Sequence, residues 1–241
     1  GLCVSVTILA PVIRFEIHYP AVYLIALSLP FALHRDAIGV VSRLIRSYSF
    51  TSDFSASARI GRAGMAVLAF LYLFVSLLPE ANAYALTMHL MIPAHVSTHH
   101  AWPFDVTRHV WALMPMGGDW VYTYVYMLGG EYGARLTNFA LLMILVQFIQ
   151  RATESRTSSG LARLAAVLFL SMPLVLTETS SLFIENFQAC LLVGGFISVA
   201  RLWSGCGTRY AWVAAALLGT ALAVKSGSFA FCCSIWRAAV V

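Results

Sequence analysis

AGMAVLAFLYLFVSLL, residues 63–78 of the chain, stands directly before Pro79 and holds no charged side chain. A helix that crosses a bilayer needs about 20 consecutive apolar residues, so we predict a membrane-spanning helix here that ends at the proline. Similar runs recur along the chain, at residues 2–13, 20–33, 132–149, 161–176, 182–203, 211–224 and from 229 onward. Because lipid offers the backbone no hydrogen-bond partners, we expect each run to be helical.

The composition favours the same class of protein. Hydrophobic residues make up 60% of the 241 residues and charged residues only 10%, whereas a soluble domain carries about 25% charged residues. This excludes an ordinary soluble domain, a disordered chain and a collagen-like fibre. The net charge of +5 is not clustered on a wetted face, so we expect no nucleic-acid partner.

We therefore predict an all-α fold, a polytopic transmembrane helical bundle, as a single domain over residues 1–241. The chain begins with Gly1 and stops at Val241 inside an apolar run. We expect it to be a fragment of a longer protein, with the runs at both ends cut short.

Arginines separate the connections between apolar runs into two kinds. Three alternate connections hold ten of the 15 basic residues, namely Arg35, Arg43, Arg46, Arg59, Arg62, Arg151, Arg156, Arg163, Arg201 and Arg209. Short loops rich in Lys and Arg stay in the cytoplasm, so we predict that these connections face inward. The opposite connections hold most of the acids, namely Glu16, Glu80, Asp105, Asp119, Glu131, Glu178 and Glu185.

One outer connection, residues 79–131, is long and rich in aromatic residues, among them Trp102, Trp111 and Trp120. Long loops with their own aromatic content are usually structured and often functional. We predict an extracytoplasmic loop that carries short interfacial helices over residues 89–98 and 120–128. The alternative is an aromatic belt that only anchors the protein in the membrane.

Histidines are concentrated in the same loop. Five of the seven lie there, namely His89, His95, His99, His100 and His109. His95 and His99 are four residues apart, which places both on one helix face and suits a divalent metal such as zinc. The alternative is a set of interfacial histidines with ordinary hydrogen bonds, and we predict no other cofactor.

Charged groups at the edge of a bilayer are costly and tend to face a cavity or a partner. A carboxylate there can act as a general base, although a solvated loop carboxylate is the alternative for each. Lys225, the only lysine, ends an apolar run on the acidic side and breaks the trend of the arginines. We expect it to bind an anionic partner, with contact to lipid phosphate as the alternative.

The order of several motifs resembles one enzyme family. PEANAYALTMHLMIP, residues 79–93, is similar to the first outer loop of bacterial GT-C glycosyltransferases, polytopic enzymes related to dolichyl-phosphate-mannose-protein mannosyltransferases. WPFD at residues 102–105, MPMGGDWVY at 114–122 and LGGEYGARLTNF at 128–139 follow in the family's order. AVKSG at residues 223–227 extends the likeness, which covers roughly residues 63–231.

The resemblance implies transfer of a sugar from a polyprenyl-phosphate donor to a glycan, lipid or protein acceptor, outside the bacterial inner membrane. A loop carboxylate would take the acceptor's proton, and a cation would lie near the lipid phosphate. By position, the catalytic candidates are Glu80, Asp105 and Asp119. The candidates for substrate binding are Tyr84, His89, Arg135, Glu178, Glu185 and Lys225.

The chain departs from the family at one critical place. Tyr84 stands where the family has its aspartate, and Met88 stands where it has a tyrosine. A tyrosine hydroxyl is a poor base at neutral pH. Either Glu80 or Asp105 then supplies the carboxylate, or catalysis is lost and the protein binds lipid-linked glycan or another partner. A transporter is a third interpretation, but the sequence lacks the paired helix interruptions that such proteins carry in their two halves.

Overall fold

The computed structural model describes residues 15–33, 39, 42, 56–102, 104, 105, 107–109 and 116–240. Every element of regular structure in this part of the chain is a helix. The elements are α2 (Pro20–Leu33), α4 (Ala56–Ser76), α5 (Ala83–Ala85), η2 (Leu86–Leu90), α6 (Met91–His99), α7 (Gly117–Glu154), α8 (Ser159–Leu170), α9 (Pro173–Ser180), α10 (Glu185–Trp203), α11 (Arg209–Val224) and α12 (Ser228–Val240). Predictions for residues 2–13, Arg35, Arg43, Arg46 and Trp111 fall outside the described residues.

Within the described residues, three helices are long and apolar enough to cross a membrane. They are the Arg59–Ser76 part of α4, the whole of α7, and α10. Helices α8 and α9 together make a fourth candidate, bent by 61° at the break between them. Such a set of helices is compatible with an integral membrane protein.

The break between α8 and α9 corrects our prediction of one continuous helix over residues 161–176. Helix α9 begins at Pro173, with Met172 in an extended conformation as its N-cap. Proline has no N–H to donate, and it keeps the residue before it out of the helical conformation. The apolar run therefore forms two helices that meet at an angle.

Helix α7 is interrupted at Gly130, whose φ of 60° and ψ of −155° are not helical. Its 38 residues would span about 57 Å as one straight helix, nearly twice the thickness of the hydrocarbon core. Only glycine adopts this backbone conformation without strain. The interruption falls between the two segments predicted separately, at residues 120–128 and 132–149.

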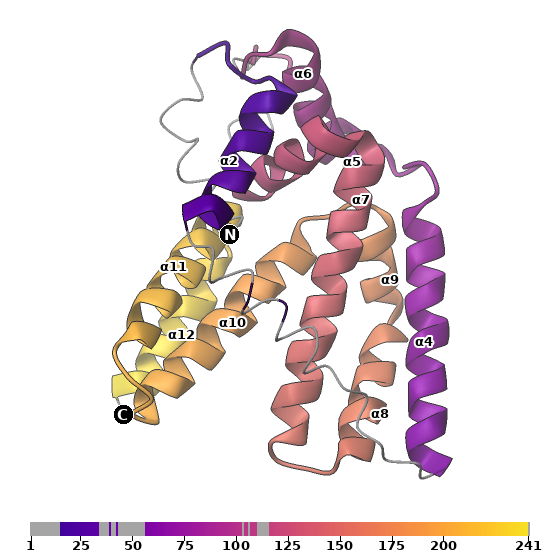
Figure 1. The fold of residues 1–241 in the computed structure, drawn as a ribbon, viewed down its shortest axis with the longest axis vertical. Helices are drawn as coiled ribbons and strands as arrows, with labels where there is room; N and C mark the ends of the chain where they lie inside the picture. The colour runs from indigo at the N-terminus through magenta and orange to yellow at the C-terminus, as the bar shows by residue number, and fades with distance from the viewer. Residues whose placement is uncertain are drawn as a thin grey trace.

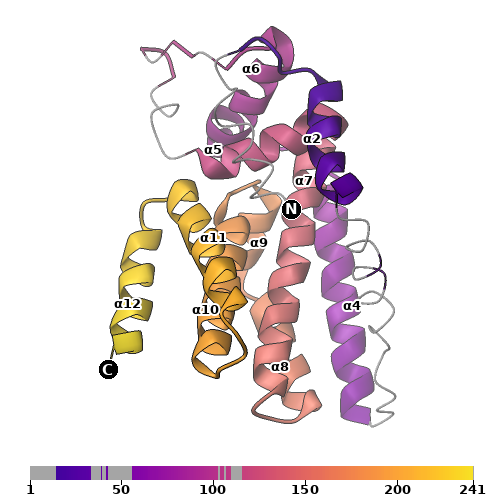
Figure 2. The same cartoon turned by 60° about the vertical axis from the view of Figure 1, so that its left-hand side comes forward.

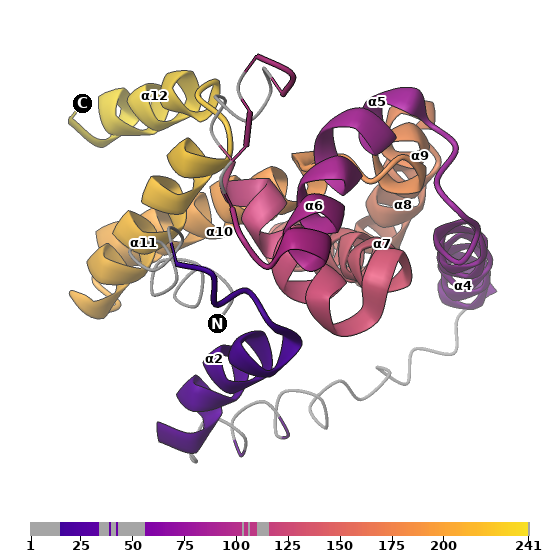
Figure 3. The same ribbon diagram turned by 90° about the horizontal axis from the view of Figure 1, so that it is seen from above.

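Helices α4, α7 and α8 pack together as one group, α10 and α11 pack together as another, and contacts between α7 and α10 join the two groups. Helix α8 packs on α4 and α7, whereas α10 packs on α11 and α7 (Figure 1). Close packing of α10 on α11 depends on Gly195, where a Cβ atom would lie 2.5 Å from Leu218 Cδ2. The segment from α5 to α6 covers one end of this assembly, above the ends of α10, α11 and α12 (Figure 2). Seen from that end, α6 packs against α7 (Figure 3).

Several arginines lie at one end of the helices, and several carboxylates lie at the other. Arg59 lies near the start of α4 and Arg209 starts α11, while Arg151 is in the last turn of α7. Asp119 and Glu185 lie in the first turns of α7 and α10, at the end that α5 and α6 cover (Figure 1). The fold therefore gathers predicted outer carboxylates around one end of the bundle.

Candidate functional site

A cavity of about 100 Å³ lies where the α5–α6 segment meets the ends of α7, α10 and α11. Its walls come from segments far apart in the sequence. The residues that line it are Tyr84, Met88, His89, Ile92, Asp119, Ile184, Glu185, Val224, Lys225 and Ser226. The cavity thus collects polar side chains at the covered end of the bundle.

Two glycines let α7 begin at the wall of this cavity. A Cβ atom on Gly117 would lie 2.8 Å from the carbonyl oxygen of Ala223, at the end of α11. A Cβ atom on Gly118 would lie 2.5 Å from the side chain of Ile184. Because both positions lack a side chain, the first turn of α7 approaches α10 and α11 closely and brings Asp119 into the cavity wall.

His89 and Asp119 form a buried pair in this wall. The Nδ1 atom of His89 lies 2.6 Å from Oδ1 of Asp119, and each side chain is only 8% exposed. Asp119 is in the first turn of α7, where a negative charge is favoured by the exposed N–H groups of a helix start. When Asp119 is ionised it can only accept, so Nδ1–H of a neutral His89 ring donates to it and the ring lone pair is on Nε2.

The chain around His89 is a π-helical turn, η2, between α5 and α6. Asn82 starts this segment, because its side-chain oxygen accepts hydrogen bonds from the N–H groups of Tyr84 and Ala85. The ring of Tyr84 contacts the imidazole edge to face, with ring centroids 5.8 Å apart. Tyr84 is half-exposed, so it forms the outer part of the cavity wall.

Lys225 and Glu185 form a second ion pair at the cavity. Lys225 Nζ donates to Glu185 Oε1 at 2.5 Å, and this hydrogen bond raises the pKa of Lys225 above its ordinary value of 10.5. Lys225 follows the last residue of α11 in an extended conformation. About half of its side chain is exposed, so the ammonium group remains available to a ligand.

Glu178, near the end of α9, lies beside this pair, within electrostatic reach of Glu185, Lys225 and His89. It does not line the cavity itself. The Oε2 atoms of Glu178 and Glu185 are both buried and lack a hydrogen-bond partner within the described residues. Three carboxyl groups, of Asp119, Glu178 and Glu185, thus lie near the single ammonium group of Lys225.

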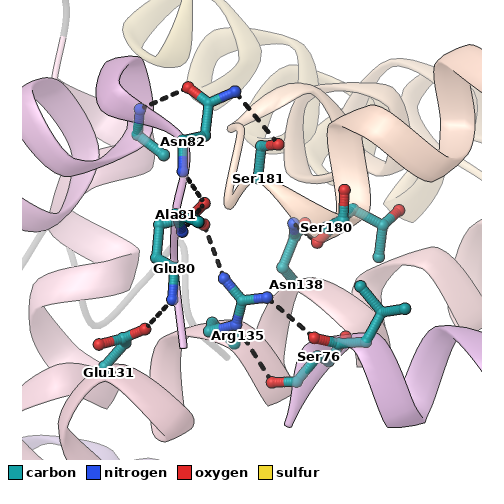
Figure 4. A network of polar contacts seen from close by, with 12 residues as sticks. Ser76, Glu80, Ala81, Asn82, Glu131, Arg135, Asn138, Ser180 and Ser181 are labelled. Carbon is teal, nitrogen blue, oxygen red and sulfur yellow. Dashed lines mark hydrogen bonds and ion pairs between the residues drawn. The ribbon is translucent and has the colours of Figure 1, made fainter. Parts of the chain in front are cut away.

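Glu80 and Arg135 lie elsewhere, in a polar network that Figure 4 shows. Arg135 Nη1 donates to Glu80 Oε2 at 2.7 Å, and both side chains are only 2% exposed. Arg135 also donates to the last carbonyl groups of α4, from Nε to Ser76 at 3.2 Å and from Nη2 to Val75 at 2.9 Å. The guanidinium group therefore caps the C-terminal end of α4.

The second oxygen of Glu80 is also occupied. Oε1 accepts hydrogen bonds from the N–H groups of Ala81 and Asn82 (Figure 4). The N–H of Glu80 in turn donates to Glu131, which follows the interruption of α7. Neither Glu80 nor Arg135 is among the residues that line the cavity. Their network ties the loop after α4 to α7.

Asp105 is exposed and also lies outside the cavity. Its side chain accepts a hydrogen bond from the hydroxyl of Thr107 at 2.6 Å, and this bond holds the pKa of Asp105 below its ordinary value. Arg108 lies 3.5 Å away, on the same turn. These contacts are local to one turn.

The paired histidines of α6 stack on each other rather than converging on one point. The ring centroids of His95 and His99 are 4.2 Å apart. Among the described residues, no group of three or more His, Cys, Asp or Glu side chains is arranged to hold a metal ion. The spacing that suggested zinc is therefore not completed by further ligands in this part of the chain.

Sequence reasoning missed two features of the site. Ser226 lines the cavity, although it stands beside Lys225 in a motif already singled out. Asn138 is buried within α7 and donates to the backbone carbonyl groups of Glu178 and Thr179, while Asn186 donates to Asn138 at 3.0 Å. An amide within an apolar run was the available signal, because such a group must find a partner.

Of the nine predicted site residues, five line one cavity, and they are Tyr84, His89, Asp119, Glu185 and Lys225. Glu178 is adjacent to it, whereas Glu80, Arg135 and Asp105 are not part of it. The arrangement joins a carboxylate–imidazole pair, which can accept a proton, to an ammonium group, which can bind an anion. Comparisons with family models, with curated proteins and with solved structures find no match to this chain.

Proposed function

We propose that the protein is a membrane glycosyltransferase that moves a sugar from a polyprenyl-phosphate donor to an acceptor hydroxyl. The observation that carries this proposal is the cavity in which a buried His89–Asp119 pair and the Lys225 ammonium group occur together. The order of the loop motifs adds support. The acceptor is a glycan, lipid or protein on the extracytoplasmic side of a bacterial inner membrane.

The chemistry requires two kinds of group. The acceptor hydroxyl must lose its proton as its oxygen attacks the anomeric carbon, and the His89–Asp119 pair is suited to accept it. The bond from that carbon to the lipid phosphate breaks, and the phosphate leaves with the bonding electrons. A cation stabilises this charge, and Lys225 serves in that role while Glu185 holds it in place.

In this proposal the α5–α6 segment and the first part of α7 lie at the membrane interface. The isoprenoid chain of the donor would remain in the bilayer while its phosphate and sugar enter the cavity. Tyr84 then contacts the sugar or the phosphate from the outer wall. Glu80 and Arg135 have a structural role, because every polar atom that could serve catalysis is already engaged within their network.

The test is the release of polyprenyl phosphate by the purified protein in nanodiscs. The donors are a panel of polyprenyl-phosphate hexoses and pentoses, offered with a membrane extract as the source of acceptors. We expect Asp119→Asn to lower turnover about 100-fold, the usual contribution of a general acid–base group. The matched control is Asp105→Asn, which removes an exposed carboxylate from the same loop. Equal loss in both variants, or in neither, contradicts the proposal.

A binding protein of the same architecture is the second candidate, and Tyr84 favours it. The position at which the resembling family has an aspartate holds a phenol ring in the cavity wall. Such a protein would bind the lipid-linked glycan without transferring the sugar. Wild-type protein would then bind short-chain polyprenyl phosphate but release none from a donor, and Tyr84→Asp would remain inactive. Gain of turnover in that variant contradicts a pure binding role.

A further inference from the structure

The pair in the cavity wall can be divided into a base and its partner. We infer that His89, through Nε2, takes the proton from the acceptor hydroxyl, and that Asp119 is a positioning residue which holds the imidazole. The inference rests on the proposed function and goes beyond it, since the resemblance suggests a carboxylate as the base.

Geometry is the first argument. The 2.6 Å contact joins Nδ1 of His89 to Oδ1 of Asp119. With Asp119 ionised, this contact holds the proton of the neutral ring on Nδ1 and leaves the lone pair of Nε2 for a substrate. His89 lines the cavity, and no hydrogen bond from its ring to another described residue competes with this role. A carboxylate that fixes the tautomer and orientation of an imidazole is the usual arrangement in histidine general bases.

The charges around the ring are the second argument. Asp119 from α7 contacts the ring, and Glu178 from α9 lies within electrostatic reach of it. Glu185 from α10, Lys225 after α11 and Tyr84 from α5 line the same cavity. An imidazolium ion formed here is stabilised by the adjacent Asp119, because opposite charges attract strongly where water is excluded.

Atoms and electrons balance in this transfer step. The acceptor O–H bond breaks, and its proton passes to Nε2 of His89. The acceptor oxygen forms a bond to the anomeric carbon as the carbon–oxygen bond to the lipid phosphate breaks. The phosphate departs with the electron pair, and the imidazolium ion later returns its proton to solvent. No metal, oxidant or further reactant is needed.

The decisive variant is His89→Asn, which keeps an amide N–H near the position of Nδ1 but has no basic atom. We expect it to lower kcat by about 100-fold or more, with the KM for the donor unchanged. If Asp119 itself takes the proton, His89→Asn keeps most of the wild-type kcat, and that result overturns the inference. Thermal unfolding of the variant in nanodiscs shows whether it remains folded.

Chemical rescue supplies a readout that a structural role would not change. Imidazole added to His89→Ala should restore part of the turnover, because it can enter the space of the missing ring and accept the proton. The same concentration of imidazole should not raise the residual rate of Asp119→Asn, in which His89 is still present. The absence of rescue in a folded His89→Ala variant overturns the inference.

Failure of the proposed function is separate. If the wild-type protein releases no polyprenyl phosphate from any donor, then sugar transfer itself is wrong, and the assignment of a base falls with it. If the wild-type protein is active and His89→Asn is equally active, only the assignment of His89 is wrong.

Discussion

Two clusters of charged side chains lie at the same end of the helices, and they differ in what they can do. The Glu80–Arg135 pair is almost fully buried, and protein groups accept or donate at each of its polar atoms described above. The His89–Asp119 and Lys225–Glu185 pairs line a cavity. Charged pairs thus have a structural role in one place, and in the other they line a cavity that a ligand can enter.

The two clusters differ in how many hydrogen-bond partners the cation has. Arg135 also donates to the carbonyl groups that end α4. Lys225 has a single partner among the residues that the structure describes, and its side chain is about half exposed. A buried pair whose hydrogen bonds are complete resists change, and a pair beside a cavity can exchange one partner for a ligand.

The largest loss of stability is expected from Arg135→Met. It leaves the Glu80 carboxylate buried without its cation, and breaking a buried pair in this way costs about 3–5 kcal/mol of stability. Denaturant unfolding in micelles measures the loss. Arg108→Met is the control, because it removes an arginine from an exposed pair with Asp105, where only a small loss is expected because water screens the charges. Equal small losses in the two variants contradict the structural role of Arg135.

A smaller loss of stability is expected from Gly117→Ala. Its Cβ atom would meet the backbone of Ala223 at 2.8 Å, so the start of α7 must move away from α11, at a cost of about 1–3 kcal/mol. Turnover should fall because Asp119 moves with it. Gly129→Ala is the matched control on the same helix, since no atom lies within 4 Å of its Cβ position. Similar turnover in both variants would show that this close approach does not position the pair.

Lys225→Gln should raise the KM for the donor about tenfold, because a hydrogen bond to a charged group is worth about 1.5 kcal/mol or more. Lys225→Arg, which keeps the charge, should lose less. The hydrogen bond to Glu185 raises the pKa of Lys225 above 10.5, so the donor KM should not change through loss of this charge between about pH 6 and 9. Any stabilisation from the pair is complete below about pH 10.5 and is lost as pH rises through the raised pKa.

The smallest effect is expected from Asp105→Asn. The carboxylate is exposed, and its hydrogen bond and ion pair with described residues lie within its own turn, so turnover and donor KM should remain at the wild-type values. The same initial-rate assay measures both. A loss comparable to that of Asp119→Asn would place Asp105 in the reaction and would argue for an arrangement of the loop that brings it to the cavity.

The sequence predicted the helices well where the apolar runs are uniform. The bounds of α2 agree with the predicted residues 20–33. Breaks were less predictable, because Gly130 and Pro173 lie inside or beside long apolar runs whose composition alone favours one helix. The membrane class follows from composition, since few charges remain to cover a surface.

The sequence also indicated which residues carry charge at the outer end, but not how they pair. Glu80 and Arg135 are 55 residues apart, and Lys225 and Glu185 are 40 apart. The residues flanking each charged side chain do not predict which carboxylate pairs with which cation. Pairing depends on the angles between helices and on close approaches such as that of Gly118 to Ile184. The local pattern around Glu80 therefore predicted a catalytic carboxylate but could not predict its buried pair with Arg135.

The most direct test compares turnover per folded molecule in Asp119→Asn and Glu80→Gln, as the initial rate of polyprenyl-phosphate release in nanodiscs. Glu80→Gln keeps an oxygen that can accept from the N–H groups of Ala81 and Asn82, and it lies outside the cavity. We predict that Asp119→Asn loses about 100-fold in rate, while Glu80→Gln stays close to the wild-type rate even though it is less stable. A full rate in Asp119→Asn together with a large loss in Glu80→Gln would contradict the assignment of the cavity as the site of sugar transfer.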